Sequence, residues 1–215
     1  MPRVRSSKLK RGKPLDKARG KLTVIAGPMF AGKTNKLLTI FSVLSRLGHS
    51  ILCFKAEAIS NGGMGHTLSH DERQLPVIYI DRNKPEKILQ YACPELQRGE
   101  RVGQDGIRKV IIDSVQFFPK DRFLKVVKQL LAQGIDVYCD GLIYDFRKRE
   151  FGATRALMKM ADECIEQYSI CVRCASRAEH TERVSGGTEQ SVGTTGKKKS
   201  EYIPVCERCH RIYGG

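Results

Sequence analysis

Residues 27–34 constrain the fold of this 215-residue chain more than any other segment. They read Gly-Pro-Met-Phe-Ala-Gly-Lys-Thr and satisfy the pattern GxxxxGK[ST]. The β-rich run 22–26 precedes them, and residues 35–47 follow with the apolar periodicity of a helix. In a strand–loop–helix context, backbone N–H groups can cradle phosphate oxygens at the positive end of the helix. The sequence therefore predicts a phosphate-binding loop.

Residue types in this loop and on a later strand indicate that the phosphates belong to a nucleotide. Lys33 would reach the β- and γ-phosphates, and the hydroxyl of Thr34 would bind Mg²⁺. Asp113 ends an apolar strand, where proteins with such a loop place the acid that holds Mg²⁺ through water. The predicted nucleotide-binding residues are Gly27, Pro28, Met29, Phe30, Ala31, Gly32, Lys33, Thr34 and Asp113.

Strands and helices are expected to alternate along the chain, which predicts an α/β fold with a mostly parallel sheet flanked by helices, as in P-loop NTPases. The long segment 55–75, rich in Gly, Ser, His and Asn, is expected to be a loop. The expected strands are 22–26, 49–54, 77–80, 110–113 and 135–139, and the expected helices are 35–47, 85–96, 123–133 and 151–164.

Charge and composition divide the chain into three expected parts: a basic tail over 1–20, a nucleotide-binding domain over 21–168 and a metal-binding module over 169–215. The net charge of +15 favours polyanionic partners. A solvated, disordered tail is the preferred interpretation of residues 1–20, and a nucleic-acid-binding arm or a transit peptide is the alternative. No apolar run approaches the roughly 20 residues of a membrane span, and no secretory signal is apparent.

The eight cysteines are distributed in a way that favours a metal site over a disulfide framework. Cys171 with Cys174, and Cys206 with Cys209, form two CxxC pairs around the Gly-, Thr- and Lys-rich stretch 186–199. Four thiolates at this spacing predict a structural zinc site, and a redox-active CxxC is the alternative. The scattered remaining thiols fit a reducing compartment, so a cytoplasmic location is expected.

These motifs together resemble those of the type II thymidine kinases. Residues 27–34 are very similar to the GPMFSGK[ST] loop of that family, and residues 113–118 resemble its DE-x-QFF segment. Residues 141–147, followed by Phe151-Gly152, are similar to its GLD-x-DFRG-x-PFG segment in the form common among bacterial members. The resemblance covers residues 21–209, and the chain is identified from it as a member of this family.

Membership implies a kinase that transfers the γ-phosphate of ATP to the 5′-hydroxyl of thymidine or deoxyuridine, generally as a homotetramer. It also implies that the zinc anchors a long C-terminal loop, the lasso, over the nucleoside base, which reduces the entropy cost of ordering that loop. Family positions assign substrate contacts to Met29, Gln116, Phe117, Leu142, Phe146, Thr181 and Tyr202.

One catalytic position departs from the family pattern. The family's general base is the Glu that follows the magnesium-binding Asp, and here that position is Ser114. A serine hydroxyl cannot accept the 5′-hydroxyl proton at neutral pH, although positioning and charge neutralisation supply most of phosphoryl transfer. Either another carboxylate, with Asp145 and Asp71 as candidates, serves as the base, or the protein is an impaired homologue that binds nucleotides or assembles with RNA or protein. The enzyme, with Lys33 in the catalytic site, is the preferred hypothesis.

Overall fold

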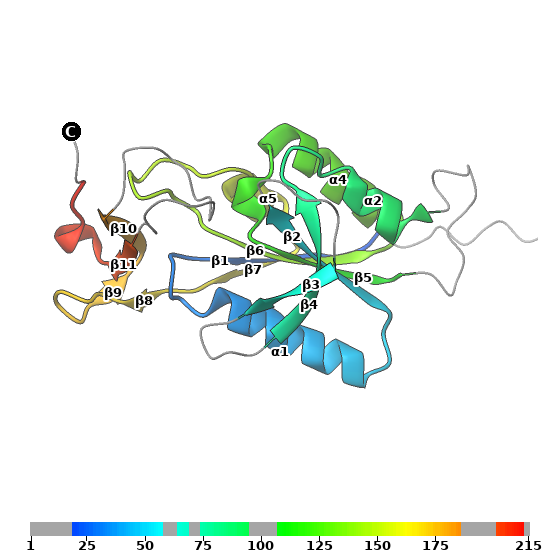
Figure 1. The fold of residues 1–215 in the computed structure, drawn as a ribbon, viewed down its shortest axis with the longest axis horizontal. Helices are drawn as coiled ribbons and strands as arrows, with labels where there is room; N and C mark the ends of the chain where they lie inside the picture. The colour runs from blue at the N-terminus through cyan, green and yellow to red at the C-terminus, as the bar shows by residue number, and fades with distance from the viewer. Residues whose placement is uncertain (1–18, 58–63, 69–73, 95–106, 186–200, 213–215) are drawn as a thin grey trace, which may run out of the picture.

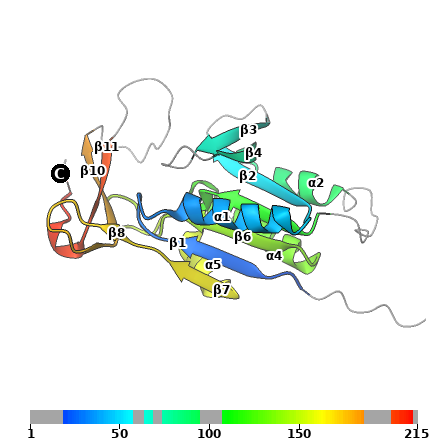
Figure 2. The same cartoon turned by 90° about the horizontal axis from the view of Figure 1, so that it is seen from below.

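The computed structural model describes residues 19–57, 64–68, 74–94, 107–185 and 201–212. Most of the predicted basic tail, the candidate base Asp71 and the stretch 186–199 lie outside the described residues. The described chain forms a central sheet with helices on both faces and a smaller group of strands beyond one end of the sheet (Figures 1 and 2).

The central sheet has seven strands in the order β3-β4-β2-β5-β6-β1-β7. Neighbouring strands pair in parallel, except β3 with β4, which are antiparallel. Their bounds are β1 Leu22–Ala26, β2 Ile51–Glu57, β3 Met64–Leu68, β4 Gln74–Asp81, β5 Lys109–Asp113, β6 Asp136–Gly141 and β7 Glu163–Glu166. The mostly parallel α/β fold that the sequence predicts is therefore confirmed.

Helix α1 (Lys33–Arg46) covers one face of the sheet, whereas α2 (Lys87–Ala92), α4 (Lys120–Ala132) and α5 (Thr154–Met160) cover the other (Figure 1). Side chains of the buried central strands alternate between the two faces, because successive residues of a strand point in opposite directions. In β5, Ile111 packs with α1, whereas Ile112 packs on the side of α4. This alternation decides which strand-end residues face α1 and its N-terminus.

The α1 boundaries follow from local chemistry. The helix begins at Lys33, two residues before the predicted start, directly after Gly32 in the left-handed conformation (φ 78°). Leu37, Leu38 and Leu44 supply its buried stripe. Gly48, also left-handed, ends the helix as predicted, because glycine adopts positive φ without a Cβ clash.

The predicted loop over 55–75 is wrong in part. Strand β2 continues to Glu57, and β3 and β4 form an antiparallel pair, with His66 opposite Pro76 in the register. Alternating burial along β4, where Leu75 and Val77 are inside, provides the packing that stabilises this edge of the sheet. The polar, glycine-rich composition of this segment predicted a loop, but packing of β4 against the core stabilises a strand pair.

The predicted helix over 151–164 is also wrong in its second half. Helix α5 ends at Met160, and Glu163–Glu166 form strand β7 along the edge of β1. The carboxylate of Asp162 accepts a hydrogen bond from the backbone N–H of Leu22 (2.7 Å), which aligns the two strands. Pairing with a distant strand overrides the local helical periodicity here.

The C-terminal module contains more sheet than the metal-anchored loop that the sequence predicts. Strands β8 (Ser169–Ile170) and β9 (Arg177–Ala178) form one antiparallel pair, and β10 (His180–Ser185) and β11 (Glu201–Val205) form another. In Figures 1 and 2 the module lies beyond the end of the sheet where β1 meets the phosphate-binding loop.

Candidate active site

The predicted phosphate-binding loop connects the carboxyl end of β1 to α1 through residues 27–32, and its last two residues, Lys33 and Thr34, begin the helix. Its first glycine is required by close packing, because a Cβ at Gly27 would lie 2.2 Å from the carbonyl oxygen of Gln167. The loop also holds Phe30 at φ 62°, a left-handed conformation that costs free energy in a bulky residue. Such strain at a helix N-terminus is consistent with a backbone shaped for a ligand.

Lys33 supplies the positive charge of the site. Its Nζ donates a hydrogen bond to the carbonyl oxygen of Pro28 (2.5 Å). Burial lowers the pKa of Lys33, and the charges of Asp140 and Asp113 oppose that shift. An ammonium group with little water around it binds an incoming phosphate strongly, because the local dielectric constant is low.

Two carboxyl groups face Lys33 from neighbouring strands. Asp113 ends β5 and Asp140 is the penultimate residue of β6, and both are almost fully buried. Burial opposes the charge of Asp113, but the ammonium of Lys55, 2.7 Å away, and hydrogen bonds hold the pKa of Asp113 below its ordinary value. Burial raises the pKa of Asp140 well above its ordinary value, and the negative charge of Asp113 is the second cause of this rise. The two environments therefore act in opposite directions, favouring the charge of Asp113 and opposing that of Asp140.

The donor set at this end of the site fits Mg²⁺. The hydroxyl-bearing Thr34 lines the cavity described below, and the ionised Asp113 lies close by on β5. Hydroxyl and carboxylate oxygens are the hard ligands that Mg²⁺ prefers.

Ser114 follows Asp113 in a left-handed conformation, with φ 64° and ψ 50°. Its hydroxyl donates a hydrogen bond to Asp113 Oδ1 (2.8 Å), and its backbone N–H donates one to Asp140 Oδ1 (2.7 Å). Ser114, at the family's base position, therefore helps to hold Asp113. The carboxyl group that lies beside Ser114 is that of Asp140, on the adjacent strand β6.

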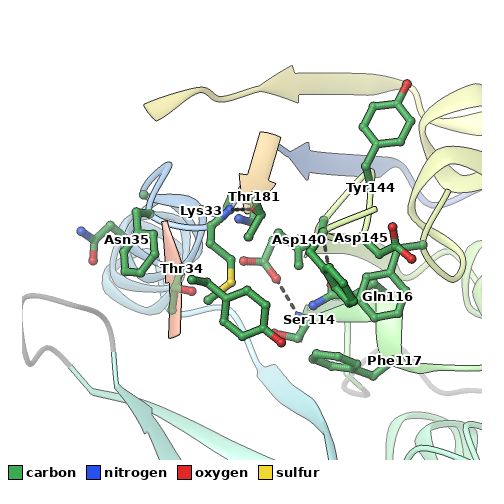
Figure 3. A pocket seen from close by; sticks show the side chains of 17 residues that line it. Lys33, Thr34, Asn35, Ser114, Gln116, Phe117, Asp140, Tyr144, Asp145 and Thr181 are labelled. Carbon is green, nitrogen blue, oxygen red and sulfur yellow. Dashed lines mark hydrogen bonds between the residues drawn. The ribbon is translucent and has the colours of Figure 1, made fainter. Parts of the chain in front are cut away.

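A cavity of about 250 Å³ opens beside these groups. Its lining joins the phosphate-binding loop to the ends of β5 and β6 and to strands β10 and β11 of the C-terminal module, as Figure 3 shows for the residues labelled there. All seven residues predicted to contact the nucleoside line it: Met29, Gln116, Phe117, Leu142, Phe146, Thr181 and Tyr202.

Aromatic rings form part of the cavity wall, and Arg183, which does not line the cavity itself, contacts two of them. The ring of Phe117 meets that of Phe151 edge to face, with centroids 5.6 Å apart. The guanidinium of Arg183 stacks over Phe146, with its Cζ 4.1 Å from the ring centroid, and donates to the hydroxyl of Tyr202 (2.7 Å). The contacts of Arg183 fix the positions of the Phe146 and Tyr202 rings. Flat apolar walls of this kind suit a planar base.

The C-terminal module is connected directly to the phosphate-binding loop. The backbone N–H of Met29 donates a hydrogen bond to Thr181 Oγ1 on β10 (2.9 Å). On another wall, the backbone N–H of Leu142 donates to Gln116 Oε1 (3.2 Å). Residues more than 100 positions apart in the sequence thus form one continuous surface.

The four predicted zinc ligands lie together. The Sγ atoms of Cys171, Cys174, Cys206 and Cys209 all lie within 4.8 Å of one another. In a tetrahedral zinc site, with Zn–S bonds of about 2.3 Å, sulfur atoms are roughly 3.8 Å apart. Hydrogen bonds from Ser176 lower the pKa of Cys174 to about 6, which favours the thiolate that zinc requires. The cluster therefore fits a closed, structural Zn²⁺ site.

The candidate base Asp145 lines the cavity but is held by its own loop. Its Oδ1 accepts hydrogen bonds from the backbone N–H groups of Arg147 and Arg149, and its Oδ2 accepts one from Arg149 Nε. An added proton would compete with these bonds. The geometry thus favours a structural position for Asp145.

Sequence reasoning missed four lining residues, of which Asp140 bears most on the chemistry. The expected strand ended at Cys139, two residues before β6 ends at Gly141. Extending it would have placed Asp136, Tyr138 and Asp140 on one face by simple alternation. The missed residues are Asn35, Asp140, Tyr144 and Phe151.

The parallel sheet, the strand–loop–helix at β1 and the adjoining cavity define an α/β nucleotide-binding protein of the P-loop class. The family model for thymidine kinases matches residues 20–210, so this chain belongs to the thymidine kinase family. A curated thymidine kinase of Pseudothermotoga lettingae is 33% identical over 194 residues, which are 89% of this chain and 95% of that protein. One from Onion yellows phytoplasma is 31% identical over 201 residues, covering 91% of this chain and 88% of its own. The family predicted from the motifs is confirmed.

Membrane insertion through a helix finds no support in the described parts of the chain. None of the helices there combines the length and the apolar character that a membrane span requires.

Proposed function

We propose that this protein transfers the γ-phosphoryl group of ATP to the 5′-hydroxyl of thymidine or deoxyuridine. One observation carries the proposal: a single cavity is lined both by Lys33 and Thr34 of the phosphate-binding loop and by Thr181 and Tyr202 of the C-terminal module. A phosphate donor and a nucleoside acceptor can therefore meet in it. Family membership supports the same reaction.

Each end of the cavity has chemistry that suits one substrate. The phosphate-binding loop and Lys33 would hold the β- and γ-phosphates through backbone N–H groups and an ammonium group. Thr34 and Asp113 would hold Mg²⁺, which neutralises charge on the transferred phosphoryl group when bound. Phe117, Leu142, Phe146 and Tyr202 would enclose the base, since apolar lining with a few polar groups is typical of small-molecule sites.

The direct test uses γ-labelled ATP and thymidine with the zinc-loaded full-length chain. We expect labelled thymidine monophosphate from the wild type and a loss of about a hundredfold or more in kcat/KM for Lys33→Ala, because one charge-stabilising contact is worth that much. Lys128→Ala is the matched control, since Lys128 is exposed on α4, on the opposite face of the sheet from α1. Absence of thymidine-dependent turnover by the wild type would refute the proposal.

That outcome would instead favour the second hypothesis from the sequence, an impaired homologue that binds nucleotides or assembles with RNA or protein. The substitution at Ser114 motivates it. It predicts ATP binding without thymidine turnover, together with nucleic-acid affinity that falls steeply with salt.

Family resemblance supports two further proposals, a homotetrameric assembly and a cytoplasmic location. Sedimentation analysis of the full chain tests the first.

Deletion of residues 1–20 tests the contribution of the basic segment to nucleic-acid binding, because loss of its positive charges should reduce the salt dependence of that binding.

A further inference from the structure

The sheet brings a second strand-end acid beside the family's base position. Ile112 of β5 is paired with Cys139 of β6, so Asp113 and Asp140 are the next residues along two adjacent parallel strands. Ile112 and Cys139 point into the core on the side of α4, and alternation therefore turns both acids toward α1. This is the face on which Lys33 begins its helix.

Asp140 also reaches the residue that lacks a carboxylate. Its Oδ1 accepts the backbone N–H of Ser114 (2.7 Å), and its side chain lines the cavity between Lys33 and Ser114 (Figure 3). A carboxyl oxygen therefore lies within hydrogen-bond distance of the backbone from which a glutamate side chain would start at position 114.

Other acids are less suited to accept a proton here. Among the described residues, the carboxylic acids that line the cavity are Asp140 and Asp145. Asp145 is bound through both oxygens to its own loop, as described above. Asp113 is paired with Lys55 and with Ser114 Oγ. Asp140 accepts the Ser114 N–H through Oδ1 and contacts the Asp113 carboxyl group, but unlike Asp145 it is not bound by a hydrogen bond to a cationic side chain of the described residues. It is almost fully buried, which keeps water from competing for its oxygens.

On the basis of the proposed kinase reaction, we propose that Asp140 supplies the catalytic carboxylate that Ser114 cannot, and accepts the proton of the nucleoside 5′-hydroxyl. As the O5′–Pγ bond forms, the O5′–H proton passes to a carboxylate oxygen of Asp140. The bond between Pγ and the β,γ-bridging oxygen breaks, and ADP leaves with its electron pair. The proton is then released to solvent with product.

The charge of the site is compatible with this step. Positive charge near an acid favours its ionised form, and Lys33 already opposes the effect of burial on the pKa of Asp140. A cation bound beside Asp113 would act in the same direction. Both charges favour the carboxylate form of Asp140, which is the form that accepts a proton.

The test compares Asp140→Asn with the wild type and with the double variant Asp140→Asn/Ser114→Glu. Asparagine retains an oxygen for the Ser114 N–H but cannot accept the proton. We expect kcat to fall about a hundredfold or more, the typical contribution of a general base. The KM for thymidine and the calorimetric Kd for ATP should change less than about threefold, as expected when a transition-state interaction is lost. The double variant returns a carboxylate from the family's own position and should recover at least about tenfold in kcat.

Asp121→Asn is the matched control, because Asp121 is exposed in the first turn of α4 and the chemical change is the same. Its kcat should stay within about twofold of the wild type. Thermal unfolding and ATP binding, measured on each variant, verify that the site is folded.

Three results would overturn the inference. Unchanged kcat in Asp140→Asn, with the wild type still phosphorylating thymidine, would remove Asp140 and leave the proposed function intact. Recovery of the Asp140→Asn kcat at high Mg²⁺ would assign the side chain to metal binding rather than to proton transfer. A folded, ATP-binding double variant without any recovery would show that a carboxylate at this place is not what the reaction needs. No turnover by the wild type is the separate result that refutes the kinase itself.

Discussion

At the scale of single residues, the site is governed by two acids with opposite electrostatic environments. Lys55 and hydrogen bonds stabilise the charge of Asp113, whereas burial and the nearby Asp113 charge oppose that of Asp140. Such divergence between two adjacent titratable groups is typical of catalytic sites. It also makes the stability of the protein depend on pH in a predictable direction.

The raised pKa of Asp140 predicts that the stability of Asp140→Asn relative to the wild type increases with pH when Mg²⁺ is absent. Between the unfolded pKa, about 3.9, and the raised folded value, the folded wild type binds more protons than the unfolded chain. The contribution of Asp140 to the unfolding free energy therefore falls as pH rises through this window, by at most about 1.4 kcal/mol per pH unit, whereas asparagine does not titrate.

Urea unfolding at pH 5 and pH 8 measures the effect. The stability difference between Asp140→Asn and the wild type should grow with pH, and that between Asp121→Asn and the wild type should not. A smaller advantage for the asparagine at pH 8 than at pH 5 would contradict the assigned direction of the shift.

At the scale of elements, strand β10 joins the C-terminal module to the phosphate-binding loop. It pairs antiparallel with β11, opposing Arg183 to Tyr202, and Thr181 on the same strand accepts the N–H of Met29. One strand therefore positions a cavity wall and contacts the loop that would bind the nucleotide. Binding at either end is expected to influence the other through this strand.

Thr181→Val should weaken thymidine binding by roughly fivefold, the equivalent of about 1 kcal/mol for one lost hydrogen bond. Valine has nearly the shape of threonine, so the apolar wall is preserved while the Met29 N–H loses its acceptor. Calorimetric titration with thymidine measures the change. Thr181→Ser keeps the hydroxyl and should bind within about twofold of the wild type; equal losses in both variants would show that the methyl group, not the hydrogen bond, matters.

At the scale of the whole molecule, two cores of very different size support the site. The central sheet buries extensive apolar clusters on both faces, whereas the C-terminal cluster has Cys171, Ala178, Val205 and Cys206 at its centre. So small a core seldom stabilises a module without a cross-link or a metal. The four-cysteine cluster is therefore expected to hold β8 to β11 together.

Removing zinc with a chelator should abolish thymidine binding and leave ATP affinity within about threefold of its initial value, because metal binding and folding of such modules are coupled. The phosphate-binding loop belongs to the large core and should persist. Cys174→Ser should reproduce the effect and lower the zinc content found by metal analysis. Cys164→Ser is the control, since Cys164 is exposed on β7 and lies outside the cluster. Equal loss of ATP and thymidine binding would contradict this division between the two cores.

Sequence patterns were sufficient wherever the chemistry is local. The phosphate-binding loop lies within eight consecutive residues, and each CxxC pair spans four, so spacing alone predicted what these segments can bind. The alternating strands and helices likewise predicted the sheet, because each element carries its own periodicity. The predicted helix over 151–164 was wrong in its second half, because the periodicity of a segment does not show that Glu163–Glu166 pairs with β1.

The amino-acid sequence by itself determined the fold class and the family, and it was enough to predict a phosphate-binding loop and four metal ligands. Only the tertiary structure decided that Asp140 lies beside Ser114, from which it is 26 positions away, and that Thr181 contacts Met29. The physical reason is that strand pairing and face alternation bring distant residues together, and these depend on the register of the whole sheet. A local sequence pattern gives the chemical type of a side chain, but it does not show which distant residues surround that side chain in the folded protein.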